Sequence, residues 1–154
     1  MAWTLLLAAG QGNRLASATG GLAKQFLDWK GAPLYWESAL VFSRCARVEG
    51  LVFVFPEACI DEERERVAGL MRNASLGIPW KVVAGGALRQ DSVRNGLSAF
   101  PDACMEVLIH DVARPFVSPV LVNRILDGLH GEASGECVAA CIPGIPVVDT
   151  IKVM

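Results

Sequence analysis

Residues 3–14 read WTLLLAAGQGNR, an apolar run that ends in a turn with two glycines. The run over residues 3–9 predicts a first β strand, because it is short and apolar as a buried parallel strand should be. Glycines directly after such a strand let backbone N–H groups approach an anion without interference from Cβ atoms. We therefore predict a phosphate-binding turn over residues 10–14, directly after the first strand.

Apolar runs alternate with amphipathic stretches along the rest of the chain. Further strands are predicted over residues 51–55, 80–84, 106–110 and 137–142. Helices are predicted over residues 33–44, with Pro33 in the first turn, over residues 61–73 and 89–100, and after Ser118, which can cap a helix that Pro119 begins and Gly131 ends. This order predicts one α/β domain over residues 1–154, with an open, mostly parallel, Rossmann-like sheet and helices on both faces.

Composition argues against several function classes. With 53% hydrophobic and 19% charged residues the chain has the composition of a globular protein, and its net charge of −2 argues against nucleic-acid binding. The apolar run at residues 5–9 is too short for a membrane span or a signal-peptide core, so we expect a cytoplasmic protein. The five cysteines form no C-x-x-C pair, which indicates reduced thiols rather than a zinc site or a disulfide framework.

The glycine-rich turn differs from two common phosphate-binding motifs. Leu15 stands where the dinucleotide fingerprint has its third glycine, and no Gly-Lys-Ser/Thr follows as in a Walker A loop. Instead Arg14 follows the glycines, and Lys24 comes ten residues later. Transfer of a phosphoryl group requires cations of this kind around the phosphates. We therefore expect both side chains to reach the triphosphate.

Several segments together indicate a family. They are KQFL at residues 24–27, GAPL at 31–34, GGALRQDSV at 85–93, LIHDVARPF at 108–116 and DTIK at 149–152. In this order they resemble the 2-C-methyl-D-erythritol 4-phosphate cytidylyltransferases, nucleotidyltransferases of the non-mevalonate isoprenoid pathway. The resemblance covers nearly the whole chain and implies the nucleotidyltransferase form of the predicted sheet.

The resemblance also implies roles for individual residues. It implies that Arg14 and Lys24 are catalytic and stabilise the transition state at the triphosphate. The residues implied to bind the nucleotide CTP are Ala8, Ala9, Gly10, Gln11, Gly12, Asn13, Gly86, Ala87, Arg89 and Ser92. The residues implied to bind the acceptor phosphate are Val112, Arg114 and Thr150. The planar guanidinium of Arg114 suits a phosphomonoester.

Asp111 follows the fourth predicted strand, at the edge where open α/β sheets bind ligands. An aspartate there can cap a turn, but the following Ala113-Arg114-Pro115 favours a functional role, in which the carboxylate holds Mg²⁺ against the phosphates. The neighbouring His110 points to the opposite face of its strand, so we expect it to be a partly buried, hydrogen-bonded histidine rather than the partner of Asp111 in a catalytic dyad.

The resemblance implies the transfer of CMP from CTP to 2-C-methyl-D-erythritol 4-phosphate. No general base is needed, because a phosphate monoester is already ionised near neutral pH. Two alternatives remain: a cytidylyltransferase for another acceptor such as ribitol 5-phosphate, and a non-catalytic nucleotide-binding module. Members of this family continue beyond the position of Met154 with an arm that crosses to a partner subunit. We therefore expect a fragment of a longer polypeptide that forms a homodimer. A longer polypeptide with a second enzymatic function is one form that this expectation allows.

Overall fold

The computed structural model describes residues 1–10, 21–131, 135 and 138–144. By its contacts the chain divides into two compact units, Met1–Val117 and Ser118–Met154. The first unit contains the central sheet, and the described part of the second contains a helix over Pro119–Leu129. We describe each unit by itself.

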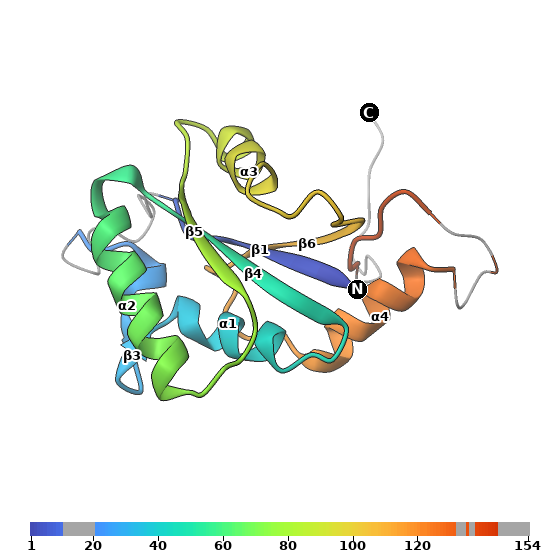
Figure 1. The fold of residues 1–154 in the computed structure, drawn as a ribbon, viewed down its shortest axis with the longest axis horizontal. Coiled ribbons are helices and arrows are strands. Elements are labelled where there is room, and N and C mark those ends of the chain that lie inside the picture. The colour runs from blue at the N-terminus through green and yellow to red at the C-terminus, as the bar shows by residue number, and fades with distance from the viewer. Residues whose placement is uncertain (11–20, 132–134, 136–137, 145–154) are drawn as a thin grey trace, which may run out of the picture. The chain divides into compact units, whose positions relative to one another are not determined.

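A four-stranded parallel sheet forms the centre of the first unit (Figure 1). Its strands are β1 (Ala2–Leu7), β4 (Val48–Phe55), β5 (Trp80–Ala84) and β6 (Glu106–Asp111). They lie in the order β5-β4-β1-β6, and each adjacent pair is parallel. The open parallel sheet predicted from the sequence is thereby confirmed.

The chain adds strands to one side of β1 first and to its other side afterwards. From β1 it proceeds to β4 and then outward to β5, whereas β6 returns to the other side of β1. Leu7, the last residue of β1, pairs with Val54 on one side and with Asp111 on the other. The carboxyl ends of β1 and β6 therefore meet at a topological switch point, the place where open α/β sheets bind ligands.

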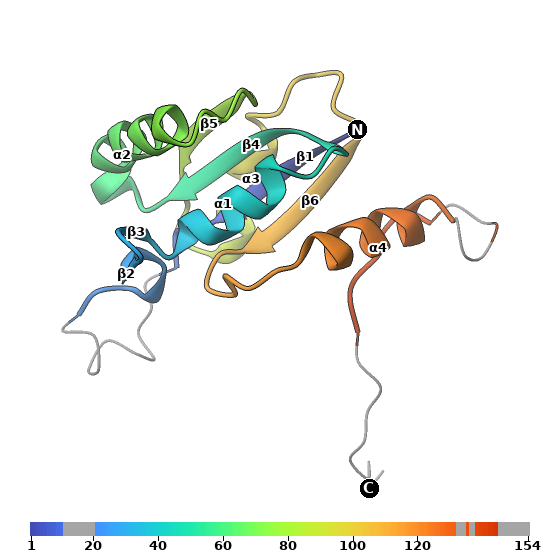
Figure 2. The ribbon, with the colours of Figure 1, turned by 90° about the horizontal axis from the view of Figure 1, so that it is seen from below.

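Helices cover both faces of this sheet, as predicted (Figures 1 and 2). One face carries α1 (Tyr35–Ser43) and α2 (Ile60–Asn73), and the other carries α3 (Arg89–Leu97). Two short 3₁₀ helices are η1 (Lys24–Phe26) and η2 (Glu57–Cys59). A two-stranded antiparallel ribbon, formed by β2 (Asp28–Trp29) and β3 (Ala32–Pro33), lies between η1 and α1 in the chain.

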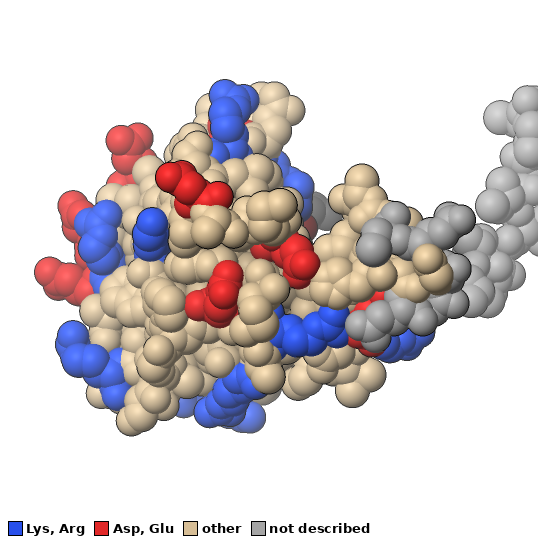
Figure 3. Space-filling model, turned by 45° about the vertical axis from the view of Figure 1, so that its right-hand side comes forward, with Lys and Arg blue, Asp and Glu red and all other residues tan. Residues whose placement is uncertain are grey.

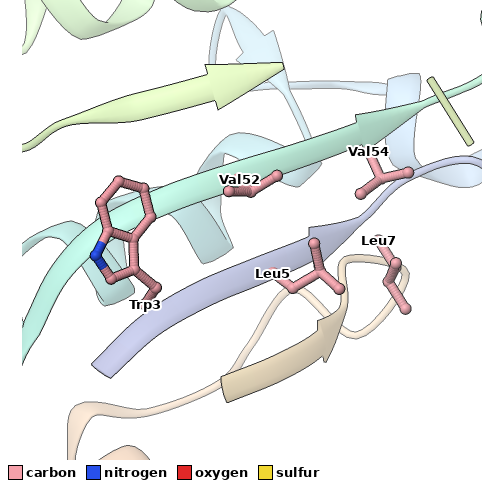
Figure 4. Packing of buried hydrophobic residues seen from close by; sticks show 5 residues of the cluster. All are labelled: Trp3, Leu5, Leu7, Val52 and Val54. Carbon is pink, nitrogen blue, oxygen red and sulfur yellow. The ribbon is translucent and has the colours of Figure 1, made fainter. Parts of the chain in front are cut away.

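The core under α3 follows from the alternation of side chains along the two central strands. Its buried members are Trp3, Leu5, Leu7, Val52 and Val54 (Figure 4). Side chains at every second position of a strand share one face. In α3, a Cβ atom at Gly96 would clash with the side chain of Leu5, so a larger residue there would force Leu5 to shift.

The opposite face is built around Tyr35 of α1, whose ring is fully buried against Phe53 and Phe55. The Tyr35 hydroxyl donates a hydrogen bond of 2.7 Å to the buried carboxylate of Glu63 on α2. Arg66 forms an ion pair with the other oxygen of this carboxylate at 2.9 Å. Burial, and then the hydrogen bond with Glu63, raise the pKa of Tyr35 far above its ordinary value. The tyrosine therefore remains a neutral donor that joins α1 to α2.

The second unit contains α4 (Pro119–Leu129). The side chain of Ser118 accepts a hydrogen bond from the backbone N–H of Leu121 at 3.2 Å, and Pro119 occupies the first turn. Beyond the helix, Gly131 has a φ of 72°, the left-handed conformation that glycine adopts readily. The capping pattern predicted from the sequence is confirmed at both ends.

Several sequence predictions are wrong in detail, among them the helix expected over residues 89–100, which ends at Leu97. Residues 138–142, the described part of the expected fifth strand, do not form a strand. The N–H of Val138 donates to the carbonyl of Leu129 at the end of α4. An apolar run forms a strand only when a neighbouring strand pairs with it. Pro33 belongs to β3 and pairs with Asp28, so α1 begins two residues later at Tyr35.

The described helices include none that is long and apolar enough to cross a membrane. On the face drawn in Figure 3, basic and acidic side chains are interspersed among uncharged ones, and the described residues form no broad basic surface there.

Candidate functional site at the switch point

The segment that leaves β1 is held on both sides by hydrogen bonds. Ala8 continues the contact with β4 through its N–H, which donates to the carbonyl of Val54 at 2.8 Å. From the other side, Nε2 of Gln25 donates to the carbonyls of Ala8 at 2.8 Å and Gly10 at 2.6 Å. Ala8, Ala9 and Gly10 are three of the predicted nucleotide-binding residues, and the structure places them at the carboxyl end of the sheet.

The turn between β5 and α3 packs closely against this segment. A Cβ atom at Gly85 would lie 2.4 Å from Cβ of Ala9 and 2.9 Å from Oγ of Ser92. The N–H of Gly86 donates to Oγ of Ser92 at 3.0 Å, which orients the buried serine toward the turn. Ala87 lies in the exposed part of the turn. The two separate sequence segments that were predicted to bind the nucleotide are therefore neighbours in space.

Asp111 ends β6 and lies within reach of α3. Its Oδ1 accepts hydrogen bonds from Nε of Arg89 at 3.2 Å and from an Nη atom at 3.0 Å. The carboxylate is 44% exposed and the guanidinium 64% exposed. The structure thus brings the predicted metal-binding residue together with a residue predicted to bind the nucleotide.

The segment after β6 begins with Val112, whose side chain is buried and whose N–H donates to the carbonyl of Leu7. Because the whole residue is only 1% exposed, Val112 offers an acceptor little accessible surface in this structure. Arg114 is exposed, and its N–H closes a turn onto the carbonyl of Asp111 at 3.0 Å. Nζ of Lys24 donates to the carbonyl of Ala113 at 3.0 Å, so η1 contacts this segment as well as the end of β1.

His110 lies on the opposite face of β6 from the site. Its Nε2 is 3.0 Å from Oγ of Ser38, and its ring packs against Phe42 of α1. Burial lowers the pKa of His110, opposed in part by the negative charge of Asp111. The expectation of a partly buried, hydrogen-bonded histidine is confirmed.

Part of the predicted site lies outside the described residues. This holds for Gln11, Gly12, Asn13 and Arg14 of the glycine-rich turn and for Thr150. Within the described part of the chain, no group of three or more His, Cys, Asp or Glu side chains could hold a metal ion. A divalent cation at Asp111 would therefore depend on ligands other than a protein cage, as Mg²⁺ bound to phosphates does.

Gln25 is the residue to which sequence reasoning gave no role. Its side chain is only 4% exposed, although it lies between Lys24 and the apolar Phe26 in an otherwise accessible segment. The sequence signal that could have identified Gln25 was its position next to Lys24. An uncharged polar residue beside a predicted catalytic cation is a candidate for orienting the same loop. Its partners are backbone carbonyls, which a sequence pattern does not reveal.

Comparison with known proteins supplies the family. The model of the family described as 2-C-methyl-D-erythritol 4-phosphate cytidylyltransferase matches residues 2–154. A protein named Bifunctional enzyme IspD/IspF, from Nitratidesulfovibrio vulgaris, is 53% identical over 150 residues, which are 97% of this chain and 37% of that protein. The chain thus spans little more than a third of the length of this relative.

Two further proteins are similar along most of the chain. A 2-C-methyl-D-erythritol 4-phosphate cytidylyltransferase from Shouchella clausii is 37% identical over 148 residues, which are 96% of this chain and 58% of that protein. The crystal structure of 4-diphosphocytidyl-2C-methyl-D-erythritol synthase from Anaerococcus prevotii superposes with a TM-score of 0.67 at 20% identity, covering 84% of this chain and 51% of the other. At this identity the structural likeness shows the fold alone.

Proposed function

Because the chain belongs to the 2-C-methyl-D-erythritol 4-phosphate cytidylyltransferase family, we propose that it transfers CMP from CTP to 2-C-methyl-D-erythritol 4-phosphate and releases pyrophosphate. In this role the protein takes part in the formation of isoprenoid precursors. The acceptor is the one in the name of the Shouchella clausii relative, and the family match covers almost every residue.

The observation that carries the proposal is the convergence of three segments at the carboxyl edge of the sheet. Ala9 after β1 lies against Gly85 after β5, and Asp111 at the end of β6 bonds to Arg89 of α3. Backbone groups near paired glycines together with one hydroxyl, that of Ser92, suit a small pyrimidine base. The phosphates would then extend toward Gly10 and the rest of the glycine-rich turn.

The residues present fit a magnesium ion that is bound mainly by the nucleotide. Mg²⁺ in phosphoryl-transfer sites takes one or two carboxylates and completes its octahedron with water and phosphate oxygens. Asp111 offers one exposed carboxylate at the switch point. When bound, Mg²⁺ would neutralise charge on the triphosphate.

The chemistry requires position and charge rather than a base. A phosphate oxygen of the acceptor attacks the α-phosphorus of CTP in line, a new phosphorus–oxygen bond forms, and the bond to pyrophosphate breaks. Arg14 and Lys24 would stabilise the negative charge that develops on the phosphates. Lys24 has the reach for this role, because its ammonium group already lies at the segment after β6.

Acceptor binding is proposed for the segment that follows Asp111. Arg114 is exposed there, and its guanidinium can bind a phosphomonoester through two parallel hydrogen bonds. Val112 and Thr150 are the other residues that we propose for acceptor binding. We further propose that the protein acts in the cytoplasm as a homodimer.

A pyrophosphate-release assay with CTP and Mg²⁺ tests the proposal. The full-length polypeptide should release pyrophosphate with 2-C-methyl-D-erythritol 4-phosphate, and ³¹P NMR should show a diphosphate diester as the product. Ribitol 5-phosphate and an assay without acceptor serve as comparisons. Faster release with ribitol 5-phosphate would replace the proposed acceptor, and no release with either acceptor would refute both cytidylyltransferase functions.

A further inference from the structure

Gln25 makes an unusual pair of contacts with the end of β1. One nitrogen, Nε2, donates to the carbonyl of Ala8 at 2.8 Å and to that of Gly10 at 2.6 Å. Both hydrogens of the amide nitrogen are thus directed at carbonyls on either side of Ala9. Gln25 is 4% exposed, and its bond to Ala8 is buried, whereas its bond to Gly10 is partly buried.

These bonds determine which backbone groups can face an anion. In a trans peptide the carbonyl and the following N–H point in opposite directions. Because the carbonyl of Ala8 is directed inward at Gln25, the N–H of Ala9 points away from Gln25. The bond to Gly10 likewise turns a second carbonyl oxygen inward. An anion approaching the end of β1 therefore encounters less of the negative end of the peptide dipoles.

Gln25 has a fixed position because its 3₁₀ helix is anchored on the core. The ring of Phe26, the next residue, packs against Tyr35 and Phe55 with centroid distances of 6.3 and 6.1 Å. On the other side of Gln25, Lys24 bonds to the carbonyl of Ala113. The short helix η1 thus contacts the segment after β1 and the segment after β6, which are the two sides of the switch point.

We propose that Gln25 is a positioning residue that shapes the beginning of the phosphate-binding turn for the triphosphate of a nucleotide. The inference rests on the proposed function for its ligand, whereas its geometry rests on the two hydrogen bonds alone. Gln25 acts through the backbone of Ala8 and Gly10 and touches no reacting atom. A glutamine with only a structural role would contribute to folding and leave the affinity for triphosphate unchanged.

The variant Gln25→Met tests this inference, because methionine keeps the length of the side chain and cannot donate to the carbonyls. Loss of two neutral hydrogen bonds that orient the turn should raise the KM for CTP by about tenfold. The KM for the acceptor should stay within about twofold, because the acceptor contacts another segment. Gln25→Asn, which is shorter by one methylene, should show a smaller change in the same direction.

Tyr35→Phe provides the matched control. It removes another buried side-chain hydrogen bond, that to Glu63, and retains the ring against which Phe26 packs. This variant should be less stable than the wild type, with both KM values unchanged. A rise in the KM for CTP in Gln25→Met alone supports a positioning role. An unchanged KM for CTP in both Gln25 variants overturns it, even if their active fraction falls.

Binding of inorganic tripolyphosphate, measured by calorimetry, separates this inference from the proposed function. If the wild type binds tripolyphosphate more tightly than Gln25→Met does but transfers no cytidylyl group, the inference stands and the proposed function fails. If transfer occurs and Gln25→Met binds tripolyphosphate as the wild type does, the inference fails. If the wild type binds neither CTP nor tripolyphosphate, both fail.

Discussion

Lys24 and Lys81 make the same kind of contact at different places in the first unit. Lys81 is exposed and Lys24 is partly exposed, and each donates its ammonium group to a backbone carbonyl, Lys24 to Ala113 at 3.0 Å and Lys81 to Ala99 at 2.7 Å. Only Lys24 lies at the switch point. Comparison of the two lysines can therefore separate a contribution to catalysis from a contribution to stability.

Lys24→Ala should lower kcat/KM for cytidylyl transfer by about 10²-fold or more, the usual effect of removing one group that stabilises a transition state. Arg14→Ala should have an effect of the same order. The thermal midpoint should change little, since the bond made by Lys24 is exposed. Lys81→Ala is the control and should retain full turnover. Equal losses in Lys24→Ala and Lys81→Ala would contradict a catalytic role for Lys24.

Arg89 and a divalent cation should compete for Asp111, because the guanidinium occupies Oδ1 of its carboxylate. In the absence of nucleotide, Arg89→Gln should bind Mn²⁺ up to about fivefold more tightly, the most that an exposed ion pair usually contributes. Asp111→Asn should lose this binding. Electron paramagnetic resonance of free Mn²⁺ measures both effects.

Arg94→Gln provides a control, because Arg94 and Asp91 form an exposed ion pair on α3 with a length of 3.0 Å. The ion pair of Arg89 and Asp111 across the site has the same length. Its affinity for Mn²⁺ should equal that of the wild type. Unchanged or weaker Mn²⁺ binding in Arg89→Gln would show that the arginine does not compete with the cation.

For helices and strands, local sequence signals predicted the elements that depend on local residues and did not predict pairing between strands. The strand over residues 80–84 was predicted to the residue, and Ser118 with Pro119 marked the start of α4 correctly. Both signals are local: an apolar run and a cap with its first turn. The expected strand over residues 137–142 failed because strand formation requires a partner, which composition alone does not provide.

The site shows the same division. The sequence placed Ala9, Gly86 and Ser92 in one nucleotide site, and the structure brings the segments after β1 and β5 together. The sequence did not predict that Arg89 would form an ion pair with Asp111 or that Gln25 would hydrogen bond to Ala8. These contacts join residues 22 and 17 positions apart through the arrangement of strands, which only the tertiary structure determines.

The contact between β6 and α1 should make stability depend on pH. Burial holds the pKa of His110 below its ordinary value, so the folded protein resists protonation of this ring. As the pH falls through about 6.5, the unfolded chain binds a proton that the folded protein does not bind. The free energy of unfolding should therefore fall toward lower pH by up to about 1.4 kcal/mol per unit, until the folded-state pKa is reached.

Urea unfolding between pH 7.5 and 5.5 measures this slope, and His110→Gln isolates its source. Glutamine can still hydrogen bond to Ser38 but does not titrate in this range. The variant should show a shallower dependence than the wild type. Equal slopes in the two proteins would assign the pH dependence to other groups.

At the scale of the whole molecule, the first unit contains the described residues of the candidate site. The end of β1, the turn before α3 and Asp111 all lie within Met1–Val117, whereas Thr150 belongs to the second unit. The central sheet and the helices on its two faces also belong to the first unit. Truncation after Val117 should therefore keep the nucleotide contacts, together with Val112 and Arg114 of the proposed acceptor site, and remove Thr150.

A polypeptide of residues 1–117 should fold cooperatively and bind CTP with a dissociation constant within about threefold of that of the full-length polypeptide. CTP at 100 times this constant should then stabilise it by about 2.7 kcal/mol, because a ligand that binds only the folded state shifts unfolding by mass action. Turnover should be lost, since Thr150 is absent. Thermal unfolding with and without CTP, together with the pyrophosphate assay, measures these effects. A polypeptide that unfolds without a cooperative transition would show that the sheet depends on residues after Val117, and one that folds without binding CTP would place essential nucleotide contacts there.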